Sequence, residues 1–191
     1  AKGGVFKTTD GGDNWFPIFD DQPFLAIGHI ALDPVNPEIV YVGTGDVNIS
    51  ITFAVGNGLY KSIDGGGTWT NIGLAEGKVI SKIRINPQNP NEIYVGCMGN
   101  PYVRDGNRGL YKTTNGGDSW EQVLFVDDDA GVIDLVMNPQ NPNILYAASW
   151  NRVRNSQESI VTGEDAKIWK TTNGGGTWEV LTNGLPTGVL N

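Results

Sequence analysis

Short apolar runs follow one another along the whole chain, and groups of Gly, Pro, Asn and Asp separate them. Short runs rich in Val, Ile and Tyr are typical of β-strands, and the small polar residues between them are typical of turns. No segment keeps the 3.6-residue spacing of an amphipathic helix. The pattern of apolar and polar positions therefore predicts an all-β protein.

One turn phrase occurs four times, about fifty residues apart, and an aromatic residue and a Lys precede each copy. The copies occupy residues 8–15, 62–69, 113–120 and 171–178. A Ser or Thr followed two residues later by Asp or Asn can bond backbone N–H groups in a tight turn, and the Gly-Gly pair supplies positive φ angles. We therefore expect a structural turn. Its defining residues are Asp10, Trp15, Asp64, Trp69, Asn115, Trp120, Asn173 and Trp178.

A calcium loop is the alternative interpretation of this phrase, because Asp10, Asp13 and Asp118 place carboxylates beside glycines. Two copies, however, have Gly67 and Gly176 where the second acid would stand. No copy has the acidic spacing of a loop that encloses calcium. We therefore expect no metal and no cofactor.

A second phrase, in which an Asx-Pro pair ends an apolar run, lies between copies of the first. It occupies residues 30–37, 83–90 and 135–142, and each copy leads into a further β-rich run. Pro and Asn at this spacing indicate a turn between two strands. One unit therefore has four strands: A before the Asx-Pro turn, B after it, C at the Gly-aromatic-Lys run and D from the Trp onward.

Four antiparallel strands in a repeated unit of about fifty residues predict a β-propeller blade rather than a set of sandwich strands. The chain has four C and D pairs but three A and B pairs. We therefore expect a partial propeller that belongs to a longer polypeptide, whose other blades are its partners. The expected parts are a half blade at residues 1–19, blades at 20–73, 74–125 and 126–184, and the start of a connection at 185–191.

The first phrase resembles the Asp-box, or bacterial neuraminidase repeat, of sialidases, xyloglucan hydrolases, sortilin-type receptors and a photosystem assembly factor. The second phrase, together with residues 125–150 and 181–186, resembles large secreted bacterial propellers of the sortilin-type or glycosyl-hydrolase-like kind. The resemblance covers essentially the whole chain. It implies a ring of seven to ten blades and an extracellular, cell-surface or periplasmic location. It does not imply one activity, because unrelated proteins share this turn.

Composition excludes some classes of partner. The formal net charge of −8 argues against nucleic acid, which requires a basic surface. The sequence contains no membrane-spanning run, signal peptide or lipidation motif. The repeated lysines of strand C are expected to solvate the outer face of each blade. They are Lys7, Lys61, Lys112 and Lys170.

The chain has one cysteine and one histidine, and neither predicts catalysis. A single Cys97 rules out an internal disulfide, and we expect it to be a small apolar residue of a B strand. His29 falls in an A strand, so a catalytic Cys-His pair is not expected.

The long irregular segments of the chain are all predicted to lie on one face of the propeller. Successive turns of an antiparallel meander alternate between the two ends of the strands, so the B–C and D–A connections share a face. The long B–C segments are residues 44–57, 98–108 and 149–166. Arginine forks and an exposed Trp there would suit a polar ligand, although solvated loops or contacts to other blades are the alternative. The candidates for ligand binding are Arg104, Arg108, Trp150, Arg152 and Arg154.

The absence of a recognisable catalytic set favours a secreted or surface propeller that binds a glycan, a peptide or a protein through this face. The alternative is a glycoside hydrolase that uses two carboxylates, for which Asp46 with Asp20, Asp21 or Asp128 are the candidates. A stalk or adhesin module that acts by its shape is a third hypothesis. Sialidase activity is the least expected, because the chain lacks the aromatic-Arg-Ile-Pro phrase of that family.

Overall fold

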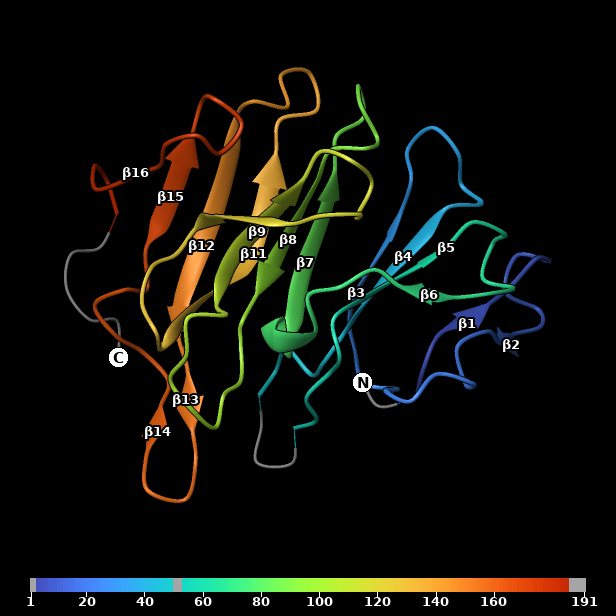
Figure 1. Cartoon of the computed structure of the whole chain (residues 1–191), viewed down its shortest axis with the longest axis horizontal. Coiled ribbons are helices and arrows are strands. Elements are labelled where there is room, and N and C mark those ends of the chain that lie inside the picture. Colours follow the sequence, from blue (N-terminus) through green and yellow to red (C-terminus); the bar gives the residue numbers. More distant parts are fainter. Residues whose placement is uncertain (1–2, 50–52, 186–191) are drawn as a thin grey trace.

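A computed structural model of the chain describes residues 3–49 and 53–185. In this part of the chain the strands form three four-stranded antiparallel sheets, a two-stranded sheet before them and a separate small hairpin. The sheets stand side by side along the chain (Figure 1). The predicted all-β partial propeller is therefore confirmed.

The strands follow chain order within every sheet. The two-stranded sheet contains β1 (Phe6–Lys7) and β2 (Phe16–Pro17). The next contains β3 (Ile27–Leu32), β4 (Val40–Thr44), β5 (Leu59–Ser62) and β6 (Thr70–Asn71). The third contains β7 (Ile80–Ile85), β8 (Ile93–Cys97), β9 (Gly109–Thr113) and β10 (Glu121–Leu124). The last contains β11 (Ala130–Met137), β12 (Leu145–Asn151), β15 (Ile168–Thr171) and β16 (Glu179–Val180).

Two short elements lie in the connections between these strands. The hairpin of β13 (Val153–Arg154) and β14 (Ser159–Ile160) extends from the loop between β12 and β15. The 3-10 turn η1 (Ala75–Gly77) precedes β7. The described residues include no helix that is long and apolar enough to cross a membrane. The predicted limits of the blades, 20–73, 74–125 and 126–184, stay predictions, because connecting residues belong to no sheet.

The innermost strand of each full sheet has a bulge at the same place. The register between strands A and B shifts after Ile27 in β3, after Ile80 in β7 and after Val132 in β11. The extra residue in β3 is Gly28, where an added Cβ would lie 2.0 Å from the carbonyl oxygen of Ile80. Neighbouring A strands therefore approach so closely that a side chain cannot fit between β3 and β7.

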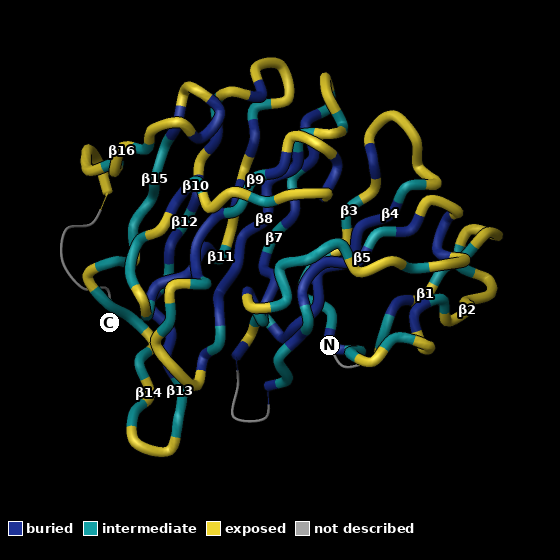
Figure 2. Tube along the Cα trace, in the orientation of Figure 1, coloured by how far each residue is buried: buried dark blue, intermediate teal, exposed yellow. Residues whose placement is uncertain are grey.

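The apolar core lies between neighbouring sheets. One buried cluster includes Tyr41 and Leu59 of the first full sheet together with Ile83 and Val95 of the next. Figure 2 shows this burial along the central strands, whereas the turns are exposed. Cys97 is fully buried in the same cluster, and burial raises the pKa of its thiol. Each sheet therefore depends on its neighbour to cover its face.

The Asp-box turn has the internal hydrogen bonds that its side chains predict. The Ser62 hydroxyl donates to Asp64 Oδ1 and accepts from Gly66 N, both at 2.8 Å. Thr68 N donates to the same carboxylate oxygen at 2.8 Å. Gly65 and Gly66 have φ angles of 67° and 96°. The other three copies repeat this set of bonds, so the phrase is a structural turn.

The lysine before each of the first three turns bonds the Asp-box turn of the following blade. Its ammonium group donates to the carbonyl oxygen of the first glycine of that turn. The three bonds join Lys7 to Gly65, Lys61 to Gly116 and Lys112 to Gly174, at 2.8, 3.3 and 3.0 Å. Three of the four lysines therefore do more than solvate the outer face, because a half-buried ammonium group meets a buried glycine at each of these interfaces.

The tryptophan of the turn makes a second bond between blades, to a residue of the preceding blade. Trp69 Nε1 donates to the carbonyl oxygen of Ile18 in the preceding half blade at 2.6 Å. The second glycine packs on the same residue, because a Cβ on Gly66 would lie 2.5 Å from Ile18 Cδ1. Trp120 and Gly117 contact Ile72 in the same way. At the third interface the Tyr94 hydroxyl donates to the same Gly174 carbonyl oxygen as Lys112, at 2.9 Å, whereas Trp178 Nε1 has no partner among the described residues.

The lysine bond can be measured by substitution. Lys112 lies 3.0 Å from a carbonyl of the next blade, whereas Lys170 bonds no described residue and lies 5.9 Å from the Tyr146 ring. We expect Lys112→Met to lower the free energy of unfolding by about 1–2 kcal/mol. Lys170→Met should lower it by less than about 0.5 kcal/mol. Urea unfolding followed by tryptophan fluorescence measures both, and equal losses would contradict the interface role.

The acidic copies of the Asp-box should make stability depend on pH. Hydrogen bonds from Thr68 and Ser62 lower the pKa of Asp64 to about 2 from its ordinary 3.8. The folded state thus favours the carboxylate, so this stabilisation is present above about pH 4 and is lost as the pH falls toward 2. Asp64→Asn, which copies Asn115 and Asn173, keeps the acceptor without the titration. Its urea midpoint should fall less between about pH 5 and about pH 2.5 than that of the wild type, and an equal fall would refute this account.

Candidate functional site

The irregular connections meet on one face, at the lower edge of Figure 1. We call this surface the loop face and define it as the described residues of 44–57, 98–108, 125–129 and 149–166. Backbone bonds join its segments directly: Asp105 N donates to the carbonyl oxygen of Asp128, and Arg152 N to that of Asp129. The Asp-box turns and the Asx-Pro turns lie at the opposite ends of the strands. The alternation of turns that the meander predicts therefore holds.

Arg108 is a buried residue whose side chain joins segments of the loop face by hydrogen bonds. Its side chain is fully buried, and its Nη1 donates to the carbonyl oxygens of Met98 and Arg152 at 2.8 and 2.9 Å. Its Nη2 donates to those of Asn100 and Val103 at 2.9 and 2.8 Å. Burial lowers the pKa of this guanidinium. Arg108 thus has a role inside the protein, not the exposed position on which its expected role in ligand binding depended.

Arg152 is buried and Trp150 is half-buried, and both make contacts within the protein. Arg152 is 4% exposed, and its guanidinium donates to the carbonyl oxygens of Ile160 at 2.9 Å and Ile49 at 2.5 Å. The same group lies over the Trp150 ring at 5.4 Å, and Trp150 Nε1 donates to the Val161 carbonyl oxygen at 2.7 Å. Both side chains therefore connect loops, which accounts for their presence without a ligand.

Arg104 and Arg154 are the two candidate arginines that remain accessible. Arg104 is exposed and pairs with both oxygens of Glu158, at 2.5 and 3.1 Å. This pairing raises the pKa of Arg104 and lowers that of Glu158. Arg154 is half-buried, and its only side-chain bond among the described residues is a long one of 3.4 Å to the Ser159 hydroxyl. These two groups can meet a ligand from solvent.

Asp46 is a buried carboxylate at the start of the loop after β4. It is 7% exposed, and its backbone N–H donates to the Ala54 carbonyl oxygen at 2.8 Å. The carboxylate accepts one backbone bond, from Asn48 N at 3.2 Å, and pairs with no cation of the described residues. The strand registers place Gly99 and Asn151 at the equivalent positions of the next two blades. The blade fold therefore does not require an acid here.

The other three candidate carboxylates are exposed. Asp20 and Asp21 lie in the connection between β2 and β3, and Asp128 precedes β11. A hydrogen bond between the carboxyl groups of Asp128 and Asp127 raises the pKa of Asp128 and lowers that of Asp127. Among the described residues, no hydrogen bond or ion pair joins Asp46 to any of these three.

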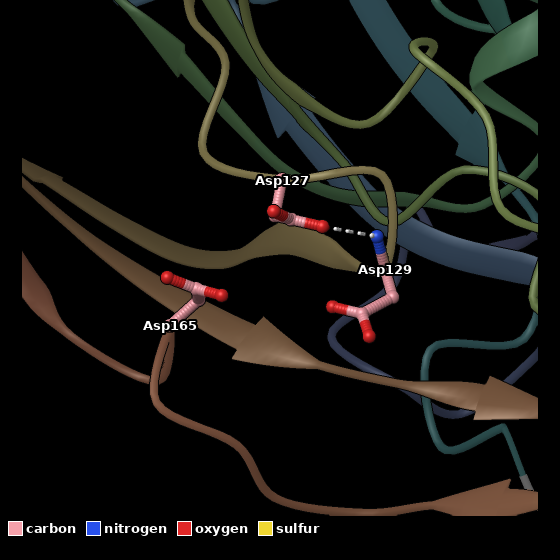
Figure 3. Close-up of side chains that lie close together, drawn as sticks. All are labelled: Asp127, Asp129 and Asp165. Carbon is pink, nitrogen blue, oxygen red and sulfur yellow. Dashed lines mark hydrogen bonds between the residues drawn. The ribbon is translucent and has the colours of Figure 1, made fainter.

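Three carboxylates that the sequence analysis did not group lie together (Figure 3). One oxygen from each of Asp127, Asp129 and Asp165 lies within 4.8 Å of the others. Asn151 Nδ2 donates to Asp129 at 2.6 Å, and Lys167 pairs with Asp165 at 3.1 Å. Oxygen ligands of this kind suit a hard cation, and here the ammonium group of Lys167 and the guanidinium group of Arg104, 3.8 Å from Asp129, supply positive charge. The run of three Asp residues in a predicted D–A connection was the available signal, but Asp165 comes from the loop between β12 and β15, some 36 residues later in the same blade.

A small buried apolar cluster packs beneath the surface of the loop face. Ile49, Phe53, Val79 and Met98 are buried together, and Trp150 packs against them. These residues come from three different blades. The loop after β4 is therefore anchored on its neighbours and not only on its own sheet.

Comparison with known proteins agrees with this architecture. The profile of the Sortilin-Vps10 family, described as sortilin, neurotensin receptor 3, matches residues 57–187, which is more than half of the chain. The chain belongs to the Sortilin-Vps10 family. The predicted resemblance to Asp-box propellers of the sortilin type is therefore confirmed.

Curated relatives of this Sortilin-Vps10 chain include xyloglucanases. A xyloglucanase of Paenibacillus sp. is 25% identical over 98% of the chain, which corresponds to 20% of the relative. A xyloglucanase of Acetivibrio thermocellus is 28% identical over 98% of the chain and 24% of the relative. The chain thus spans about a fifth to a quarter of the length of these relatives.

Solved structures of glycoside hydrolase family 74 (GH74) share the fold. The GH74 xyloglucanase of Xanthomonas campestris has a TM-score of 0.69 and 18% identity, over 95% of this chain and 27% of that one. An ancestral GH74 enzyme has a TM-score of 0.66 and 22% identity, over 96% and 22% of the two chains. At these identities the likeness establishes the propeller architecture of this Sortilin-Vps10 chain.

The bracing role of Arg108 predicts a large effect on stability. Loss of its guanidinium would leave buried carbonyl groups without donors, so we expect Arg108→Met to lower the free energy of unfolding by about 3 kcal/mol. Arg104→Met removes an exposed ion pair and should lower the free energy of unfolding much less. Urea unfolding measures both variants of this Sortilin-Vps10 propeller. A loss in Arg108→Met no larger than in Arg104→Met would show that the buried bonds contribute little.

Proposed function

We propose that this propeller takes part in the hydrolysis of a β-linked glucan, with xyloglucan as the first substrate to test, and that Asp46 is one of the two reacting carboxylates. The buried, unpaired carboxylate of Asp46 on the loop face is the observation that carries the proposal. The two curated relatives described above, both xyloglucanases, supply the substrate class.

The position of Asp46 is physically costly for the fold. Asp46 is a buried residue, and burying an acidic side chain without a cation to pair with it disfavours the folded state. The equivalent positions hold Gly99 and Asn151, so the blade can be built without this cost. Groups that violate the folding rules in this way are typical of functional sites. The bond from Asp46 N to the Ala54 carbonyl oxygen and the end of β4 hold the backbone of Asp46 in a defined place.

Glycoside hydrolysis needs a second carboxyl group, so that one acts as general acid and the other as base or nucleophile. Within this chain we assign Asp128 as the second candidate, because its shared hydrogen bond with Asp127 raises its pKa and favours the protonated form that a general acid needs. Asp20 and Asp21 are the other candidates of the chain. Since the chain spans about a quarter of its relatives, the partner carboxylate can also come from the remainder of such a protein.

The proposed substrate has consequences for location. A polysaccharide is too large to enter a cell intact, so an enzyme that acts on it must be exported. We therefore infer an extracellular, cell-surface or periplasmic location.

A binding module without catalysis is the second candidate function. The accessible guanidinium groups of Arg104 and Arg154 favour it, because they present hydrogen-bond donors to solvent on the loop face. Such a module would bind the polysaccharide and release no sugar from it.

Asp46→Asn tests the hydrolase in the longest polypeptide that carries this sequence. We expect the release of reducing sugar from xyloglucan to fall by about 100-fold or more, because the variant cannot transfer a proton or attack. The matched control is Asp33→Asn at an Asx-Pro turn away from the loop face, where Asn86 and Asn138 already occupy the equivalent positions. It should retain full release. Unchanged release in Asp46→Asn overturns the assignment, and binding without release by the wild type supports the binding module.

A further inference from the structure

We propose that Tyr102 is a stacking platform for one sugar ring of a β-linked glucan, an inference that rests on the proposed function. The Tyr102 ring stacks on the Phe53 ring, with 4.6 Å between centroids and 29° between planes. Phe53 is 7% exposed, whereas Tyr102 is 48% exposed. One face of the tyrosine ring is therefore covered by Phe53, while the residue as a whole remains open to solvent.

The loop that carries Tyr102 is held from both sides. Tyr102 N donates to Asn100 Oδ1 at 3.0 Å, and the neighbouring Pro101 carbonyl accepts from Arg154 N at 2.6 Å. Arg108 bonds the carbonyl groups of Asn100 and Val103, on either side of the ring. An aromatic ring that is fixed before binding loses little entropy when a ligand stacks on it.

The need to cover Phe53 does not by itself explain why residue 102 is a tyrosine. Phe53 belongs to the buried cluster with Ile49, Val79 and Met98, and an aliphatic side chain at position 102 would cover it as well. The Tyr102 hydroxyl has no bond to a described residue. A flat apolar face with a free polar edge suits a ligand that is itself apolar on its faces and polar at its rim.

A β-linked glucose unit has this shape, because its C–H bonds point to the two faces of the ring and its hydroxyl groups lie at the edge. The groups beside Tyr102 suit that edge. Asn155 Nδ2 donates to the Tyr102 carbonyl oxygen at 3.3 Å, and its side chain also lies 3.4 Å from Glu158, the partner of Arg104. Asn155, Glu158 and Arg104 thus form a chain of polar side chains that begins at the backbone of Tyr102, and amide, carboxylate and guanidinium groups can bond sugar hydroxyl groups.

The test is calorimetric titration with cellohexaose and with a xyloglucan oligosaccharide. Tyr102→Leu keeps an apolar cover over Phe53 and removes the flat ring, so we expect binding about tenfold weaker than in the wild type. Tyr102→Phe keeps the ring and should bind within about twofold. The matched control is Tyr146→Ala, which removes an exposed tyrosine of β12 and should not change binding. Thermal unfolding confirms that each variant is folded.

The outcomes separate this inference from the proposed hydrolase. If Tyr102→Leu binds as the wild type does while Asp46→Asn abolishes sugar release, the platform is overturned and the hydrolase stands. If Tyr102→Leu binds weakly but the wild type releases no sugar, the platform stands as a binding site and the hydrolase is overturned. Failure of the wild type to bind either probe overturns both.

Discussion

The arrangement of the blades depends on the bond between a lysine of one sheet and an Asp-box glycine of the next. The internal bonds of the Asp-box hold that glycine carbonyl in a fixed place, so Lys61, for example, meets Gly116 at a defined distance. The second glycine, which has no side chain, lets Ile72 of the preceding blade pack against the turn. These hydrogen bonds thus set the distance between neighbouring sheets, and the apolar clusters fill the space between them.

The loop face has no repeated bond of this kind. There, buried arginines join the segments of neighbouring blades instead. Irregular loops leave backbone carbonyl groups that must find donors once water is excluded. Arg108 supplies donors to loops from two blades, and Arg152 joins the hairpin segment to Ile49. The arginines of this face therefore divide into those that sustain the loops and those, such as Arg104, that solvent can reach.

Local chemistry made much of the fold predictable, and tertiary contacts made the rest unpredictable. The turn bonds of Ser62 and Asp64 follow from residues two to six positions apart, and the four-stranded unit follows from the spacing of two phrases. The burial of Arg108 does not follow from sequence, because its acceptors lie on separate segments whose approach depends on blade packing. The grouping of Asp165 with Asp129 joins the loop between β12 and β15 to the segment before β11 of the same sheet, so it depends on how these two connections fold together.

Repeats offer a comparison within one molecule that separates folding from function. Tyr41, Tyr94 and Tyr146 occupy one position of strand B in three blades, which indicates that the blade itself uses an aromatic residue there. At the position of Asp46 the three blades differ, so packing does not explain the acid. The Sortilin-Vps10 profile and the GH74 structures both match this scaffold, so the scaffold by itself does not assign a function. The loop face is where the repeats of this chain differ, and the buried residue Asp46 and the Tyr102 ring that stacks on Phe53 both lie there.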